Sequence, residues 1–194
     1  MKCWFPANMC QHTFLALLGP ESTVYDFGAN RGEFSHGIIE RFGSSAFAAE
    51  PIPSFAELIK RHPKLHLVIA TISDRNGTAP IKLFEHFCST LLGSENPEPS
   101  AFRQTVETVC YSEFQRRTNT HHVDLLTVDI EGAEFALFDS MTDADLANCD
   151  QITVEFQDFL YPEMQTRVEA KKRRIGRIGF RVVLFRLIIP TSCF

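Results

Sequence analysis

The sequence predicts one α/β domain built around an open, mostly parallel sheet. Short apolar runs alternate with segments of helical periodicity, which is the pattern of repeated strand–helix–strand units. Residues 22–35 change from a strand pattern through a glycine turn to a helix pattern. Acidic residues follow several of the apolar runs, at the places where parallel strands would end. The 194 residues fit a single domain spanning residues 1–194, with residues 1–20 as an N-terminal helical cap.

The composition argues against several classes of protein. The chain is 44% hydrophobic, which is enough for a globular core, and its net charge of −5 makes a nucleic-acid partner unexpected. Its six cysteines are scattered without a Cys-x-x-Cys pair, so no metal site is predicted. The N-terminus does not have the apolar segment of a secretory signal, and no apolar run approaches the ~20 residues of a transmembrane helix. We therefore expect a cytoplasmic protein without a membrane partner.

The glycine turn indicates what kind of ligand the domain would bind. Glycines at such a turn let the backbone approach a ligand closely. A dinucleotide fingerprint, G-x-G-x-x-G starting at Gly28, would need two further glycines where this chain has Asn30 and Glu33. The Gly-Lys-Ser/Thr ending of a P-loop is also missing. Glu33 would repel a phosphate at the start of the following helix but would not repel a cationic ligand.

Carboxylates recur at the ends of the predicted strands. Glu50 closes the strand 45–50 and lies about 20 residues after Gly28, where an acid can accept hydrogen bonds from ribose hydroxyls. Asp74 follows the strand 65–72. It is a candidate to contact an adenine, and residues 74–77 have the sequence of a hairpin turn that leads to an added strand; both readings can hold. Asp129 and Glu155 end two later strands. Because ligands bind at the carboxyl ends of strands in open α/β sheets, these acids predict one site.

Other segments have more local signals. Residues 9–19 have the spacing of a short helix that Gly19 and Pro20 would end. Residues 88–104 have the composition of a loop, which would be a lid over the site or an irregular connection. The charge run 171–174 is expected on a solvated helix face, with an acidic partner as the alternative. Further elements are expected as helices at 53–61, 112–117, 161–175 and from about 133, and as strands at 79–84, 105–111 and 150–156.

Several motifs, in this order along the chain, resemble the FkbM family of methyltransferases that use S-adenosylmethionine (SAM). They are VYDFGANRGEFS, AFAAEP, ATISDRNGTAPIKLF, VDLLTVDIEGAE, ITVEFQDF and RIGFRVVLFR. The resemblance implies the Rossmann-like three-layer sandwich of class I methyltransferases, with an inserted hairpin and an antiparallel C-terminal strand. Pro190 would truncate that last strand, because proline cannot donate to a central ladder. Thr127 stands where the family often has lysine, and little consequence is expected.

The resemblance also implies roles for individual residues. The turn from Asp26 through Phe27, Gly28 and Asn30 to Gly32 would wrap the methionine part of SAM. Glu50 and Pro51 would hold the ribose, and Ser73 and Asp74 would lie by the adenine. Asp129 would contact the cofactor. Independently of the resemblance, a hydroxyl acceptor must lose its proton, so the carboxylates Asp129, Glu131 and Glu155 are candidate bases, and Glu131, just beyond the strand, is favoured. The implied reaction is O-methylation of a hydroxyl on a sugar, a polysaccharide or a natural product.

Two other functions remain open at this point. The chain would bind SAM without turnover if its shortened C-terminus has cost it activity. It would be a nicotinamide-dependent oxidoreductase if the glycine turn accepted a dinucleotide, which Asn30 and Glu33 argue against. A small-molecule or glycan acceptor is the expected partner. A homodimer would form if an exposed sheet edge at the C-terminus paired two chains.

Overall fold

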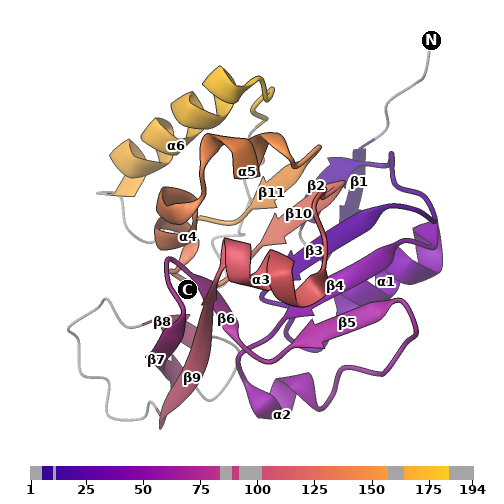
Figure 1. Ribbon diagram of the computed structural model, residues 1–194, viewed down its shortest axis with the longest axis vertical. Coiled ribbons are helices and arrows are strands. Elements are labelled where there is room, and N and C mark those ends of the chain that lie inside the picture. Colours follow the sequence, from indigo (N-terminus) through magenta and orange to yellow (C-terminus); the bar gives the residue numbers. More distant parts are fainter. Residues whose placement is uncertain (1–5, 11, 84–88, 92–101, 157–163, 184–194) are drawn as a thin grey trace, which may run out of the picture.

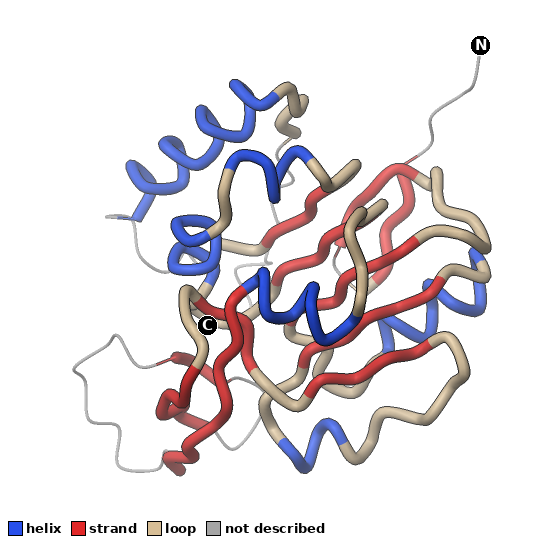
Figure 2. The backbone as a smooth tube through the Cα atoms, in the orientation of Figure 1, coloured by secondary structure: helices blue, strands red, loops and turns tan. Residues whose placement is uncertain are grey.

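The computed structural model describes residues 6–10, 12–83, 89–91, 102–156 and 164–183 (Figures 1 and 2). Its centre is a five-stranded sheet in the order β11-β10-β3-β4-β5, in which every pairing is parallel. The expected α/β class with a mostly parallel sheet is therefore confirmed. The strands are β3 (Thr23–Phe27), β4 (Ser45–Ala49), β5 (Leu65–Val68), β10 (Leu125–Val128) and β11 (Ile152–Val154).

The central strands end in register at one edge of the sheet. Phe27, the last residue of β3, pairs with Ala49 at the end of β4 and with Val128 at the end of β10. Val128 in turn pairs with Val154, the last residue of β11. The segments that follow these strands therefore start side by side, which is the arrangement needed to build a site from four separate parts of the chain.

The two faces of the sheet are covered by different helices, since alternate residues of a strand point to opposite faces. Tyr25 and Phe27 of β3 face α3 (Tyr111–Thr118) and pack against Phe114, each with ring centroids 4.9 Å apart. Val24 points the other way, to the cluster that contains Phe34 and Ile38 of α1 (Glu33–Phe42). Figure 1 shows α3 in front of the sheet and α1 behind it.

A second sheet has the order β6-β9-β7-β8 and corrects two predictions. Its strands are β6 (Thr71–Ser73), β7 (Gly77–Leu83), β8 (Ser89–Leu91) and β9 (Phe102–Cys110). The predicted strand 65–72 is interrupted, because the Ala70 N–H bonds back to the Val68 carbonyl at 3.0 Å. The turn 74–77 does not make a hairpin, because β9 lies between β6 and β7 and pairs with both.

The predicted N-terminal helix is also wrong. Within residues 6–15 the chain forms an antiparallel pair of strands, β1 (Pro6–Met9) and β2 (His12–Leu15). Burial along β2 alternates with a period of two, because His12 and Phe14 are buried whereas Leu15 is exposed. The two buried rings pack edge-on against Phe34 of α1, at centroid distances of 5.1 and 6.0 Å. Packing on α1 therefore outweighs the local helical spacing.

The helices after the glycine turn agree with the sequence in position but not always in length. α2 (Pro53–Ala56) is shorter than predicted, and α5 (Asp143–Ala147) was not predicted. α4 (Glu134–Ser140) and α6 (Gln165–Ile178) lie close to their expected places. The charge run on α6 is more than a solvated face. Arg174 donates to the Phe138 and Met141 carbonyls at 2.5 and 2.6 Å and pairs with Asp143, which ties α6 to the end of α4.

Some predictions fall largely outside the described residues. Most of the loop predicted at 88–104 does, although β8 and the start of β9 occupy its described parts. The predicted C-terminal strand lies mostly beyond residue 183, and residues 181–183 are not in a strand. Within the described ranges, no helix is both long and apolar enough to cross a membrane.

Candidate functional site

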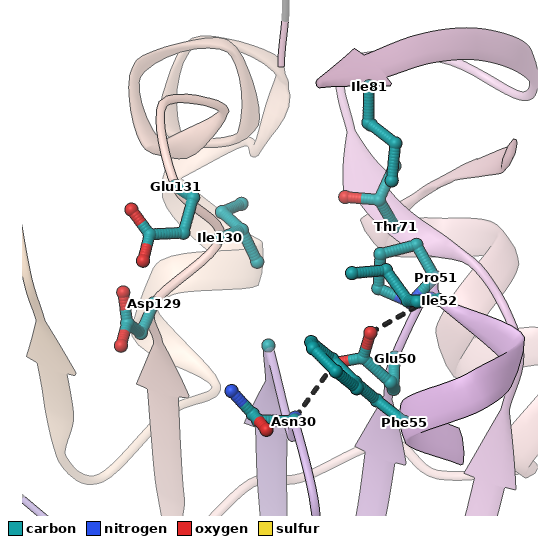
Figure 3. Close-up of a pocket in the computed structure, with 11 residues that line it drawn as sticks. Asn30, Glu50, Pro51, Ile52, Phe55, Thr71, Ile81, Asp129, Ile130 and Glu131 are labelled. Atoms are coloured by element: carbon teal, nitrogen blue, oxygen red, sulfur yellow. Dashed lines mark hydrogen bonds between the residues drawn. The ribbon is translucent and has the colours of Figure 1, made fainter. Parts of the chain in front are cut away.

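A pocket lies where the ends of β3, β4 and β10 meet, as the sequence predicted for this edge. Two residues from the second sheet, Thr71 of β6 and Ile81 of β7, close its far side. Figure 3 shows Asp129 and Glu131 on one side and the Glu50 segment on the other. The described residues that line it are Gly28, Asn30, Glu50, Pro51, Ile52, Phe55, Thr71, Ile81, Asp129, Ile130 and Glu131.

Gly28 marks the closest approach of β3 and the segment after β10. Its φ is +91°, and a Cβ there would lie 1.8 Å from the Asp129 carbonyl oxygen. The Asp129 N–H donates to the Phe27 carbonyl at 2.9 Å, which fixes this segment against β3. The sequence predicted a glycine that lets a ligand approach, and the structure shows a glycine that lets the neighbouring backbone approach.

Glu50 connects two of the pocket's segments. The Asn30 N–H donates to one of its carboxylate oxygens and the Ile52 N–H to the other, each at 2.8 Å. Asn30 has a φ of +49°, a left-handed conformation in which this bond holds it. Burial raises the Glu50 pKa to about 7, although the two backbone N–H groups act in the opposite direction. Each oxygen has a second lone pair that can accept a further hydrogen bond.

Asp129 is surrounded by other acidic side chains, whose charges raise its pKa. Burial raises its pKa to about 7, with contributions in decreasing order from Glu155, Glu131, Glu134 and Asp26. Its Oδ1 is buried and accepts no hydrogen bond within the structure described here. Such an atom needs a donor, because a buried polar group without a partner costs free energy. A ligand hydroxyl or a cation in the pocket would supply it.

Three residues of the glycine turn that were predicted to bind the cofactor, Asp26, Phe27 and Gly32, are buried in the protein interior. Asp26 is 2% exposed, and its carboxylate accepts a hydrogen bond from the Ser35 hydroxyl at 2.5 Å and lies 3.3 Å from the Thr127 hydroxyl. Burial raises its pKa. Phe27 is part of the core, and a Cβ on Gly32 would lie 2.9 Å from a methyl carbon of Ile59. These residues support the pocket without lining it.

The predicted adenine-side residues lie elsewhere. Ser73 and Asp74 are not among the described residues that line the pocket. Asp74 forms an ion pair with Arg75 at 2.7 Å, and it lines a second groove together with Gly132, Phe135 and Arg167. In that groove the Arg167 guanidinium lies 4.2 Å from the centre of the Phe135 ring.

The structure places two of the three predicted bases in the pocket and the third outside its described lining. Asp129 and Glu131 line the pocket, whereas Glu155 raises the pKa of Asp129 through its charge.

The sequence predicted no metal set. Among the described residues, His122, Asp124 and Asp150 bring possible metal-ligand atoms within 4.8 Å of one another. These residues lie at the amino ends of β10 and β11, whereas the pocket lies at the carboxyl ends of the strands.

Sequence reasoning missed the apolar lining and one acid. Ile52 and Phe55 follow Glu50 closely and could have been included with it, but Ile81 reaches the pocket only through the second sheet. Glu134 lies in the first turn of α4, where an acid commonly does no more than stabilise the helix dipole. Its carboxylate instead bonds the N–H groups of Ile130 and Gly132 in the segment before α4.

One of the comparisons with known proteins identifies a family. None of the curated proteins compared with the chain matches it. A family model described as the methyltransferase FkbM domain matches residues 26–182, well over half of the chain, including the end of β3, the strands β4 and β10, and the pocket that follows them. The chain therefore belongs to the FkbM methyltransferase family.

Proposed function

We propose that this methyltransferase uses SAM and transfers its methyl group to a hydroxyl of a sugar, a polysaccharide or another natural product. The observation that carries the proposal is the charge of the pocket. Glu50, Asp129 and Glu131 line it, and no lysine, arginine or histidine is among its described lining residues. A phosphate-bearing cofactor would be repelled by such a lining, whereas a sulfonium cation would be attracted.

The pocket offers contacts for the separate parts of SAM. Glu50 has two lone pairs to spare for the ribose hydroxyls, and its backbone bonds hold it in place before any ligand arrives. Ile52, Phe55 and Ile81 give the same side of the pocket an apolar surface that a purine ring would cover. Asp129 lies on the other side with its orphaned oxygen. When bound, SAM would supply an electrophilic methyl group.

The same carboxylates account for the proton that a hydroxyl acceptor must lose. A general base works best when its pKa lies near the working pH. Asp129, with a pKa of about 7, meets this condition, because burial and the neighbouring acids raise it from its ordinary range. Glu131 lines the pocket one residue beyond Ile130 and remains the alternative base. One of Asp129 and Glu131 would therefore take the proton of the acceptor, and the other would orient the acceptor.

The experiment that tests this function is transfer of a radiolabelled methyl group from SAM to a panel of hydroxyl acceptors, including mono- and oligosaccharides. The proposal expects labelled product with the wild-type protein, and a rate lower by about 10²–10⁴-fold in whichever of Glu131→Gln and Asp129→Asn removes the base. Arg173→Ala, at an exposed position on α6, is the control. Tight SAM binding without any labelled product across the panel would favour a SAM-binding protein over an enzyme.

A further inference from the structure

The segment between β10 and α4 has a backbone conformation that requires support. Glu131 has a φ of +51° and Gly132 a φ of +106°. The left-handed region is unfavourable for a residue such as glutamate, so a conformation of this kind persists only where surrounding contacts impose it. At its start the segment is held by Gly28 and by the bond from the Asp129 N–H to Phe27.

Glu134 holds the other end of this segment. Its side chain is 1% exposed and folds back from the first turn of α4. The Ile130 N–H donates to Oε1 at 3.1 Å, and the Gly132 N–H lies 3.1 Å from Oε1 and 3.0 Å from Oε2. One carboxylate therefore accepts hydrogen bonds from the backbone N–H groups on both sides of Glu131. Hydrogen bonds to a charged acceptor are among the stronger ones in proteins.

Glu134 is also one of the acidic residues whose charges raise the pKa of Asp129. Four acids from three surrounding parts of the fold raise the Asp129 pKa: Glu155 after β11, Glu131 and Glu134 at the start of α4, and Asp26 in β3. The Glu134 carboxylate also bonds the backbone that carries Asp129 and Glu131. A change at this side chain would alter both the shape of the segment and its electrostatic field.

We propose that Glu134 is a positioning residue of this site, which fixes the Asp129–Gly132 segment through two backbone N–H groups and adds its negative charge to those around Asp129. The inference rests on the proposed function, in which Asp129 and Glu131 act on the acceptor. It does not require Glu134 to touch the substrate or the cofactor.

Two substitutions separate the two parts of this role. Glu134→Gln removes the charge, and its amide oxygen in the Oε1 place can still accept from Ile130, whereas its amide NH2 then faces the Gly132 N–H in the Oε2 place. Glu134→Ala removes the charge and both hydrogen bonds. Asp145→Asn is the matched control, since Asp145 also bonds backbone at the start of a helix, in the capping box of α5. It perturbs stability without lining the pocket.

The test is made on the protein without any ligand. Titration of carboxyl-labelled aspartate by NMR, with Asp129→Asn to assign the signal, gives the Asp129 pKa in each variant. Hydrogen exchange gives the protection of the Ile130 and Gly132 amides. In Glu134→Gln we expect a lower Asp129 pKa with the Ile130 amide still protected. In Glu134→Ala we expect both amides to exchange at least about tenfold faster. Asp145→Asn should change neither readout.

The inference is overturned if the Asp129 pKa is the same in the wild type and in Glu134→Gln, or if the two amides stay protected in Glu134→Ala. Once an acceptor is known, Glu134→Ala should lower kcat by about 10²-fold, because a misplaced group mainly affects the chemical step. Glu134→Gln should recover much of that loss and shift the pH profile to lower pH. A protein that binds no SAM would refute the proposed function but leave both ligand-free readouts interpretable.

Discussion

Gly28→Ala tests whether the contact between β3 and Asp129 builds the site. An alanine Cβ would lie 1.8 Å from the Asp129 carbonyl oxygen, whereas real Cβ atoms essentially never come closer than 3.0 Å to a neighbour. One backbone therefore has to move by about 1.2 Å, the difference between these two distances. The positive φ adds roughly 1–2 kcal/mol and the overpacking roughly 1–3 kcal/mol. We expect the free energy of unfolding to fall by about 2–5 kcal/mol.

The assay is urea unfolding followed by circular dichroism, with two glycine controls. Gly43→Ala has a φ of +71° but no atom closer than 3.6 Å to the new Cβ, so it carries the backbone cost of about 1–2 kcal/mol alone. Gly176→Ala, inside α6 with nothing within 4 Å, should stabilise the protein by about 0.5–1 kcal/mol. If Gly28→Ala costs no more than Gly43→Ala, the close approach of the two backbones does not constrain the site as argued.

Three further predictions follow from contacts around the site. Glu50→Ala should weaken SAM binding by about 1.5–3 kcal/mol in a calorimetric titration, and unchanged affinity would remove Glu50 from the ribose site. Because the pKa values of Glu50 and Asp129 are raised to about 7, the folded state holds more protons than the unfolded state, so stability should fall as pH rises from about 4 to about 7. Urea unfolding should show a smaller pH dependence in Asp129→Asn, and an identical dependence would contradict the assignment. Arg174→Ala should lower the free energy of unfolding by about 1–3 kcal/mol, since it leaves two carbonyls at the end of α4 unpaired, whereas Arg173→Ala should change it little.

The part of the fold that follows the central strands could be predicted because its signals are local. The glycine turn, the acid at Glu50 and the segment beginning at Asp129 each follow a short apolar run. Parallel pairing then brings strand ends together wherever the strands lie in sequence. For this reason five residues predicted for the cofactor line the pocket, namely Gly28, Asn30, Glu50, Pro51 and Asp129.

The errors arose where distant contacts decide the structure. Residues 9–19 have helical spacing, but β2 places His12 and Phe14 on Phe34 and so alternates with a period of two. The turn after Ser73 has the sequence of a hairpin, yet β9 enters between β6 and β7. Neither the packing partner on α1 nor the inserted strand can be read from the local sequence.

The roles of the acids depended on burial, which the sequence does not show. Asp26 and Asp129 both follow or end a strand pattern, but Asp26 turns inward to Ser35 whereas Asp129 lines the pocket. Glu134 looked like an ordinary acid in the first turn of a helix, and its bonds to Ile130 and Gly132 became visible only with the backbone conformation of the segment before it. The pattern of acidic residues therefore indicates the edge where the pocket lies, and the structure shows which of these acids line it.

The most direct test of the proposed function is the melting temperature of the protein with saturating SAM, S-adenosylhomocysteine or NAD. A ligand at 100 times its dissociation constant stabilises the folded state by roughly 2.7 kcal/mol. The acidic pocket predicts a rise with SAM and S-adenosylhomocysteine and none with NAD. A rise with NAD alone, or no change with any of the three, would contradict the claim that Glu50, Asp129 and Glu131 form a SAM site.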